Sequence, residues 1–163
     1  MSVIKVRDLA YGRLRAPDLD VMEEFLTNFG MIRSARTPNA LYMRGTDPKH
    51  HIHITEKGDP KYVAFGYYAA SEDDLQRVAK ASGASAVETI DEPGGGKRVR
   101  LRDPNGYQIE VVHGIPTPPV IRVPVQEMNT GTAPLRRAGE LMRLRKSPTP
   151  IKRIGHGVLG TPK

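Results

Sequence analysis

The stretch LAYGRLRAPDLDVMEEFLTNFG, residues 9–30, sets the fold because it passes from an extended segment into a helix and then ends that helix. Asp18, which follows Pro17, is suited to cap the start of a helix, and Gly30 is suited to end it. Apolar residues recur between them at helical spacing: Val21, Met22, Phe25, Leu26 and Phe29. The pattern predicts an amphipathic helix preceded by a strand over residues 6–15.

Three short strands are expected after this helix, near residues 31–37, 40–44 and 50–55. The same order then repeats. A strand at 61–68 leads to a helix that is capped by Ser71 and closed by Gly83, and strands follow near 85–90, 97–102 and 107–112. The chain therefore contains two βαβββ modules, at about residues 1–57 and 58–114.

Each module alone would leave an apolar sheet face in water, and pairing the two modules removes that exposure. We expect an α+β domain over residues 1–114, in which the modules form a cup-shaped mixed sheet with the helices outside. Alternate strand residues then line a cavity on the concave side.

Residues 115–163 differ from this domain in composition. They hold 9 Lys+Arg and 2 Asp+Glu, whereas residues 1–114 hold 16 of each, so the whole net charge of +7 lies in the C-terminal stretch. Residues 115–150 are rich in proline and are interpreted as a linker with one helix, at about 134–145. Residues 151–163 are interpreted as the first strand of a second, truncated domain.

The basic stretch contains no aromatic residue, so it is not expected to bind nucleic acid. A basic tail that docks on an acidic partner is an alternative interpretation. The chain has no cysteine, which excludes disulfides and thiolate metal sites. No apolar run approaches the roughly 20 residues that a membrane span requires, and we expect a cytoplasmic protein that does not contact membranes.

Three segments resemble the vicinal oxygen chelate superfamily, which includes glyoxalase I, bleomycin-resistance proteins and the type I extradiol ring-cleavage dioxygenases. They are LRDPNGYQIE at 101–110, YVAF at 62–65 and EDDL at 72–75. The opening LAYGRL, residues 9–14, is most similar to the first domain of the extradiol dioxygenases. The segment IGHGVLGTP, residues 154–162, is similar to the first strand of their second domain.

The resemblance implies the non-catalytic N-terminal half of an Fe(II)-dependent extradiol dioxygenase, a homo-oligomer that acts on a small aromatic diol. His156 would be the first of three iron ligands, with the other two beyond residue 163, and Mn(II) is an alternative metal. No catalytic residue and no bound metal are then expected within this chain, which alone would be inactive. The alternative is a metal-independent small-molecule binding protein of the bleomycin-resistance type.

The family's inward-facing positions fall on Tyr11, His53, Tyr62 and Glu110. Because both first-strand positions hold tyrosine, whose phenol stays protonated near neutral pH, we expect a hydrogen-bonded cluster that fills the cup without a metal. A weak divalent-metal site on His53 and Glu110 is the alternative. His51 and His53 are also expected to share one strand face, although a zinc site normally needs a third protein ligand.

Overall fold

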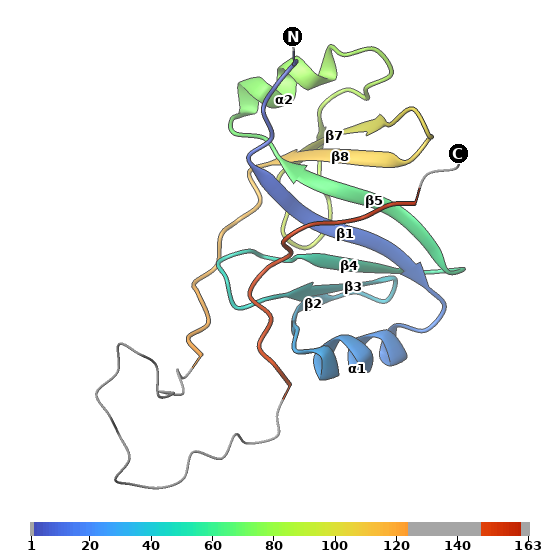
Figure 1. Ribbon diagram of the computed structural model, residues 1–163, viewed down its shortest axis with the longest axis vertical. Coiled ribbons are helices and arrows are strands. Elements are labelled where there is room, and N and C mark those ends of the chain that lie inside the picture. The colour runs from blue at the N-terminus through green and yellow to red at the C-terminus, as the bar shows by residue number, and fades with distance from the viewer. Residues whose placement is uncertain (1, 124–147, 161–163) are drawn as a thin grey trace, which may run out of the picture.

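The computed structural model describes residues 2–123 and 148–160. These residues form two helices and eight strands in the expected order (Figure 1). The elements are β1 Asp8–Ala16, α1 Leu19–Phe29, β2 Ile32–Arg36, β3 Ala40–Arg44, β4 His53–Lys57, β5 Lys61–Tyr68, α2 Glu72–Ala79, β6 Glu88–Thr89, β7 Lys97–Arg102 and β8 Gln108–His113.

All eight strands belong to one mixed sheet, in the order β2-β3-β4-β1-β5-β8-β7-β6. Within each module the first strand pairs in parallel with the last, β1 with β4 and β5 with β8. The modules meet where β1 and β5 pair antiparallel at the centre of the sheet. The expected α+β fold, with twin βαβββ modules in one curled mixed sheet, is confirmed.

The helix signals in the sequence act as expected at three of four ends. The Asp18 side chain accepts hydrogen bonds from the backbone N–H groups of Asp20 and Val21, and Gly30 ends α1 with a left-handed φ of 107°. The Ser71 side chain accepts a hydrogen bond from the N–H of Asp74 at the start of α2. The prediction that Gly83 closes α2 is wrong, because the helix already ends at Lys80 and Gly83 serves the following turn with a φ of 76°.

Both helices pack on the same face of the sheet, which we call the outer face. Residues Leu41 and Met43 of β3 pack against α1, and Val99 and Val111 of β7 and β8 pack against α2. Because successive strand residues point to opposite faces, Tyr42 and Glu110 lie on the other side of the sheet. We call that helix-free side the inner face.

Two predicted strands are shorter than expected. β4 begins at His53 rather than near residue 50, and β6 covers only Glu88–Thr89. The chain before β4 is held by other contacts, since the N–H groups of Thr46 and Asp47 bond to the carbonyls of Ile151 and Lys152. The chain before β4 thus contacts the C-terminal part of the chain through Thr46 and Asp47, and it rejoins the sheet at Ile52, which bonds to Met43 and Gly12.

Helix α1 buries less of its apolar surface than the sequence pattern suggests. Leu19 and Leu26 are 4% exposed, whereas Val21, Phe25 and Phe29 are 64%, 59% and 57% exposed. The apolar arc of the helix is wider than the strip of sheet beneath it, so one flank of α1 remains in solvent.

Residues 151–160 run as an extended segment across the outer face, over the central strands (Figure 1). The N–H of Ile151 bonds to the carbonyl of Gly30, and Gly157 packs on the Phe65 ring so closely that a Cβ would lie 2.3 Å from its Cζ atom. The segment does not join the strand ladder of this sheet. The helix expected at about 134–145 lies outside the described residues.

Gly66 provides a test of the inner-face packing. A Cβ on Gly66 would lie 2.6 Å from Cζ of Tyr11, so Gly66→Ala should lower the free energy of unfolding by about 1–3 kcal/mol, as overpacking does. Urea unfolding monitored by circular dichroism measures the change. Gly155→Ala is the matched control, because nothing lies within 4 Å of a Cβ there. Equal stability of the two variants would contradict the packing described here.

Candidate functional site

The inner face carries a row of residues from three neighbouring strands. Tyr11 of β1, Gly66 of β5 and Glu110 of β8 lie side by side in the sheet register. Gly66 lacks a side chain, so the Tyr11 ring can cross above β5, and its hydroxyl donates a 2.5 Å hydrogen bond to Oε2 of Glu110. Tyr11 and Glu110 are each 1% exposed, so this pair is fully removed from water.

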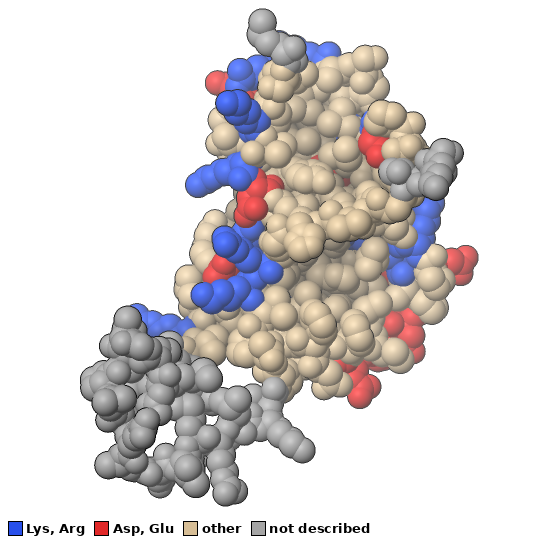
Figure 2. All heavy atoms as spheres, in the orientation of Figure 1, with Lys and Arg blue, Asp and Glu red and all other residues tan. Residues whose placement is uncertain are grey.

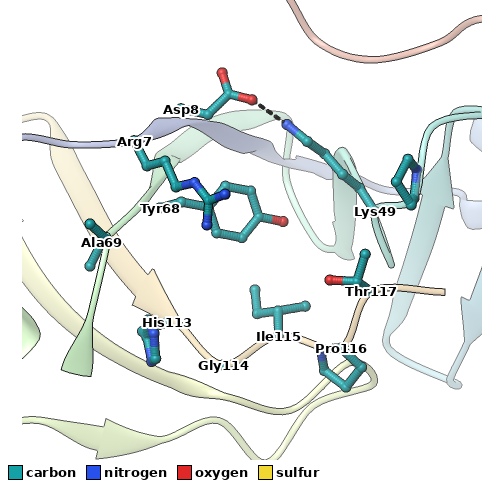
Figure 3. A pocket seen from close by; sticks show the side chains of 12 residues that line it. Arg7, Asp8, Lys49, Tyr68, Ala69, His113, Gly114, Ile115, Pro116 and Thr117 are labelled. Atoms are coloured by element: carbon teal, nitrogen blue, oxygen red, sulfur yellow. Dashed lines mark hydrogen bonds and ion pairs between the residues drawn. The ribbon is translucent and has the colours of Figure 1, made fainter.

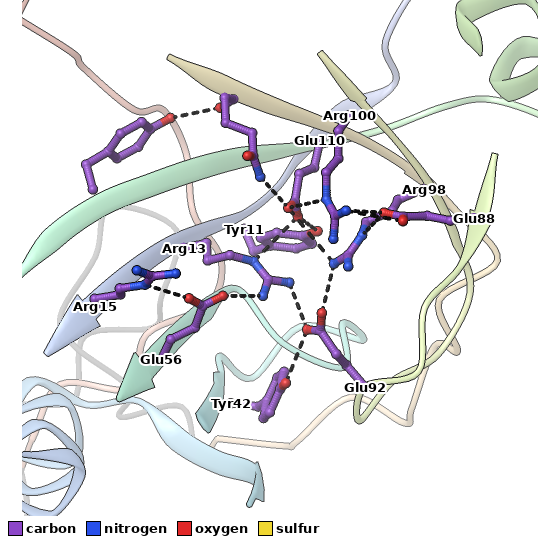
Figure 4. A network of polar contacts seen from close by, with 12 residues as sticks. Tyr11, Arg13, Arg15, Tyr42, Glu56, Glu88, Glu92, Arg98, Arg100 and Glu110 are labelled. Carbon is purple, nitrogen blue, oxygen red and sulfur yellow. Dashed lines mark hydrogen bonds and ion pairs between the residues drawn. The ribbon is translucent and has the colours of Figure 1, made fainter. Parts of the chain in front are cut away.

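Arg13 lies two residues after Tyr11 and therefore on the same face of β1. Its guanidinium donates to Glu56 at 2.9 Å and to Glu92 at 2.8 Å, and its Nε atom lies 3.5 Å from Oε2 of Glu110 (Figure 4). The Nε contact is an ion pair without hydrogen-bond geometry. Only 6% of the Arg13 side chain is exposed, so three carboxylates surround one buried cation.

Two arginines of β7 complete the network from the other side (Figure 4). Arg98 contacts Glu92 at 2.8 Å and Glu88 at 2.5 Å, and lies 3.9 Å from Oε1 of Glu110. Arg100 lies 3.8 Å from the same oxygen. The carboxylate of Glu110 is thus enclosed by cations on the inner face.

The protonation of the network follows from its charges. Burial raises the pKa of Tyr11, and the negative Glu110 raises it further, so Tyr11 remains a neutral phenol. Burial alone would raise the pKa of Glu92, but its bonds to Arg13 and Arg98 outweigh burial and lower it to about 2. Burial would lower the pKa of Arg13, but the attraction of Glu110 reverses this. Tyr11, Glu92 and Arg13 therefore keep fixed protonation states near neutral pH.

Aromatic and histidine side chains border the network. Tyr42 donates a 3.2 Å hydrogen bond to Glu92, and the His51 ring lies 5.0 Å from the Tyr11 ring and 5.6 Å from the Tyr42 ring. Nδ1 of His51 lies 2.9 Å from Nδ1 of His50. The inner face is therefore filled with side chains that satisfy one another.

The structure brings together two of the four inward-facing candidates, Tyr11 and Glu110. His53 and Tyr62 lie on the outer face, where they line an apolar pocket of about 460 Å³ beneath residues 151–159. His53 pairs with Gly12, the neighbour of Tyr11, and its Nε2 lies 2.8 Å from the Thr55 hydroxyl. Glu110 and His53 therefore lie on opposite sides of the sheet, so they do not form the weak metal site that was the alternative.

A β-bulge explains the position of Tyr62. The β1–β5 register passes from Arg13 opposite Ala64 to Leu14 opposite Tyr62, which leaves Val63 without a partner. A shift of one residue moves a side chain to the other face. Without the bulge, Tyr62 would lie opposite Arg15 on the inner face.

The expectation that His51 and His53 share one strand face is wrong. β4 begins only at His53, so the two residues do not belong to the same extended strand. His51 stacks on the inner-face residue Tyr11, whereas His53 lines the outer-face pocket. A site that uses both rings is not formed.

The inner face does not suit a metal ion. Both Glu110 oxygens are engaged, Oε2 by Tyr11 and Oε1 by Gln108 at 3.0 Å. The adjacent space holds the guanidinium groups of Arg13 and Arg98, which repel a second cation. In residues 2–123 and 148–160, no three His, Cys, Asp or Glu side chains form a group able to hold a metal ion. His156 is exposed on the outer face.

A second, polar pocket of about 330 Å³ opens beyond the ends of β5 and β8 (Figure 3). Lys49 pairs there with Asp8 at 2.6 Å, and its Nζ atom lies 5.3 Å from the centre of the Tyr68 ring. Arg7 and His113 also line it. The pocket shares none of its lining residues with the Glu110 network.

Sequence reasoning missed Arg13, Glu92 and Arg98. A usable signal existed in KRVRLR, residues 97–102, where arginines alternate with Val99 and Leu101. The apolar residues pack toward α2, so the pattern places Arg98 and Arg100 on the inner face. In the same way, Arg13 lies two residues after Tyr11 in one strand, so alternation places both side chains on the inner face.

Removal of the central cation tests the network. Arg13→Met leaves Glu110 buried beside fewer cations, so the free energy of unfolding at pH 7 should fall by about 3–5 kcal/mol. Arg15→Met is the control, because the Arg15 side chain is 46% exposed and its ion pair with Glu56 is worth at most about 1 kcal/mol. Guanidinium unfolding compares the two. A loss below about 1 kcal/mol in Arg13→Met would contradict a central role.

The buried histidines predict how stability depends on pH. Burial lowers the pKa of His51 to about 3 and that of His53 to about 4, whereas both rings bind protons near pH 6.5 when unfolded. The unfolded state binds more protons below pH 6.5, so stability is complete above that pH and is lost as pH falls toward 4. The slope should reach about 1.4 kcal/mol per pH unit for each ring.

Chemical unfolding at several pH values between 6.5 and 5 measures this slope. His53→Gln should remove about half of it, and the double variant with His51→Gln most of it. An unchanged slope in both variants would show that these rings are solvated in the folded protein.

Comparisons with known proteins agree with the fold. The chain is 28% identical over 159 residues to metapyrocatechase 2 of Cupriavidus necator. The aligned region covers 96% of this chain and 48% of that protein. The chain thus covers about half the length of this curated relative.

Two solved structures share the architecture. A Mn(II)-bound glyoxalase from Novosphingobium aromaticivorans superposes with a TM-score of 0.68 at 19% identity, covering 74% of this chain and 43% of the other. The 2,3-dioxygenase LapB from Pseudomonas sp. KL28 superposes with a TM-score of 0.64 at 20% identity, covering 72% and 44%. At these identities the likeness shows the fold alone.

A protein-family model matches residues 8–111 of the chain, which make up most of the twin-module domain. Together with the confirmed fold, this match assigns the chain to the glyoxalase/bleomycin resistance protein/dioxygenase superfamily.

Proposed function

We propose that residues 1–114 are the non-catalytic first domain of an Fe(II)-dependent extradiol dioxygenase that acts on a small aromatic diol. In this proposal residues 115–150 link the domain to a second one, whose first strand is residues 151–163. Iron, with Mn(II) as the alternative, is held by His156 and by two ligands that follow Lys163. The iron supplies the chemistry that inserts both atoms of O2 next to the diol.

The observation that carries the proposal is the filled inner face. In a catalytic member this face has to leave room for a metal, a substrate and O2. Here Tyr11 and Glu110 are in direct contact, and Arg13 contributes a permanent positive charge beside them. A metal would have to displace a buried guanidinium from three carboxylates, which costs several kcal/mol.

The relation to longer proteins supports the same division. The chain aligns along 96% of its length with about half of metapyrocatechase 2. Homoprotocatechuate 2,3-dioxygenase from Brevibacterium fuscum shares the fold, and this chain covers 35% of it. A domain that lacks a metal-compatible face therefore has relatives in which further sequence is available to bind the metal.

The residues of this chain would then position the segment that carries His156. Gly157 packs on the Phe65 ring, and the Tyr107 hydroxyl donates a 2.7 Å hydrogen bond to the carbonyl of Gly160. These contacts hold the segment across the central strands just after His156. The rigid sheet, braced by its inner ion pairs, serves as the support for that segment.

Metal content and ring cleavage test the proposal. We expect less than about 0.1 iron per chain after the 163-residue protein is incubated anaerobically with Fe(II) and desalted, and no ring-cleavage product from catechol. A longer chain that includes the sequence after Lys163 should retain about one iron and cleave catechol. In that longer chain, His156→Ala should lose the iron while Tyr11→Phe keeps it.

Stoichiometric iron in the 163-residue chain that is lost in Glu110→Gln would contradict the proposal, because it would place the metal on the inner face. Equally, a longer chain whose His156→Ala variant keeps its iron and activity would assign the metal to other ligands. Metal analysis is independent of activity, so a failure to bind substrate cannot be mistaken for a failure to bind iron.

A further inference from the structure

Helix α1 presents an apolar stripe to solvent along one flank. Val21, Phe25 and Phe29 are four residues apart, so they lie one above another on the helix. Their exposures are 64%, 59% and 57%, and the rings of Phe25 and Phe29 stack with centroids 6.1 Å apart. Single exposed apolar residues are ordinary, but an aligned set of three with two phenylalanines indicates a contact surface.

The stripe continues into the outer-face pocket. Phe29 is both the last residue of the stripe and a wall of the 460 Å³ apolar pocket, and Val158, which also lines it, is 82% exposed. Figure 2 shows uncharged side chains across the middle and lower part of this face, with charged side chains at its margins. An apolar centre with a charged rim is the usual anatomy of a protein–protein interface.

The two ends of the stripe carry opposite charges. Asp18 and Asp20 are exposed at the start of α1, where Asp20 also pairs with Arg36. Lys152 and Arg153 are exposed near its end, because the N–H of Ile151 bonds to the carbonyl of Gly30 there. Figure 2 shows Asp and Glu at the lower right edge of the face, whereas its left side carries mostly Lys and Arg.

We propose that this face binds a second copy of the chain, with the two α1 stripes antiparallel about a twofold axis near Phe25. In a twofold interface the same patch serves both partners, so it must complement itself. An antiparallel arrangement places the acidic end of each stripe on the basic end of the other. The proposal deepens the expected homo-oligomer by naming its surface, and it does not depend on where iron is held.

Sedimentation velocity of the 163-residue chain tests the interface. At about 100 μM and physiological salt we expect a species of twice the 18.0 kDa chain mass. Phe25→Glu places a charge at the centre of the contact and should raise the dissociation constant at least about 30-fold, as a hot-spot loss of 2 kcal/mol does. Val3→Glu is the matched control, because Val3 is 54% exposed outside this face.

Charge reversal tests the antiparallel arrangement itself. Asp20→Arg and Arg153→Glu should each weaken the dimer about 5- to 10-fold, since like charges then face each other. The double variant restores an attractive pair in the opposite sense, so its dissociation constant should return to within about threefold of the original. Circular dichroism should show equal thermal stability at dilutions where every variant is monomeric.

A chain that remains monomeric at about 100 μM would overturn the proposal and leave the face to a different partner. A dimer that Phe25→Glu does not weaken would also overturn it, because the contact would lie elsewhere. A dimer in which the charge reversals add rather than compensate would exclude the antiparallel arrangement. None of these outcomes changes the iron content expected of the chain, so a failure here is distinguishable from a failure of the proposed function.

Discussion

The burial of the Arg13 guanidinium is the constraint on which the rest of this domain depends. A buried cation is tolerated only when carboxylates compensate it, and these come from β4, from the loop after β6 and from β8. Arg13 itself belongs to the first module, whereas Glu92 and Glu110 belong to the second. One side chain therefore ties the two modules together across the central β1–β5 pair, in addition to the hydrogen bonds of the ladder.

The same constraint determines what the inner face can do. Each carboxylate that balances Arg13 is held by at least one further donor, so the network has little capacity left for a ligand. Tyr11 completes the network with a short hydrogen bond to Glu110. Its ring crosses above Gly66, which has no side chain to block it. In this chain the inner face acts as a structural brace, because its ion pairs connect β1, β4, β7 and β8 with the loop after β6.

The local part of this structure was readable from the sequence, and the non-local part was not. Asp18 and Ser71 cap the two helices as predicted, and the order of the strands along the chain is also as predicted. These features depend on residues that are close together in the sequence. The face of the sheet on which Tyr62 lies is set by a bulge that leaves Val63 unpaired. The residues around Tyr62 give no sequence signal of this bulge. The bond between Thr46 and Ile151 joins residues that lie far apart in the sequence, and local patterns do not predict it.

Side-chain exposure followed the same division. The periodicity around Phe25 correctly predicted a helix, but periodicity does not tell how wide a strip of sheet lies beneath it. The burial of Arg13 was not predicted, because arginine is seldom buried in proteins. Its position two residues after Tyr11 indicates the face of the strand but not the carboxylates that surround it. Alternation correctly indicated the face of Arg13, Arg98 and Arg100, but it failed for Tyr62 because of the bulge and for His51 because this residue precedes β4.

The two faces of the sheet differ in what they can offer a partner. This domain fills the inner face with ion pairs and leaves exposed apolar side chains on the outer side. Charged groups paired inside a rigid sheet offer a partner nothing to bury, but Phe25, Phe29 and Val158 do. We therefore place the proposed contact with a partner on the outer face, where residues 151–160 already lie against the central strands.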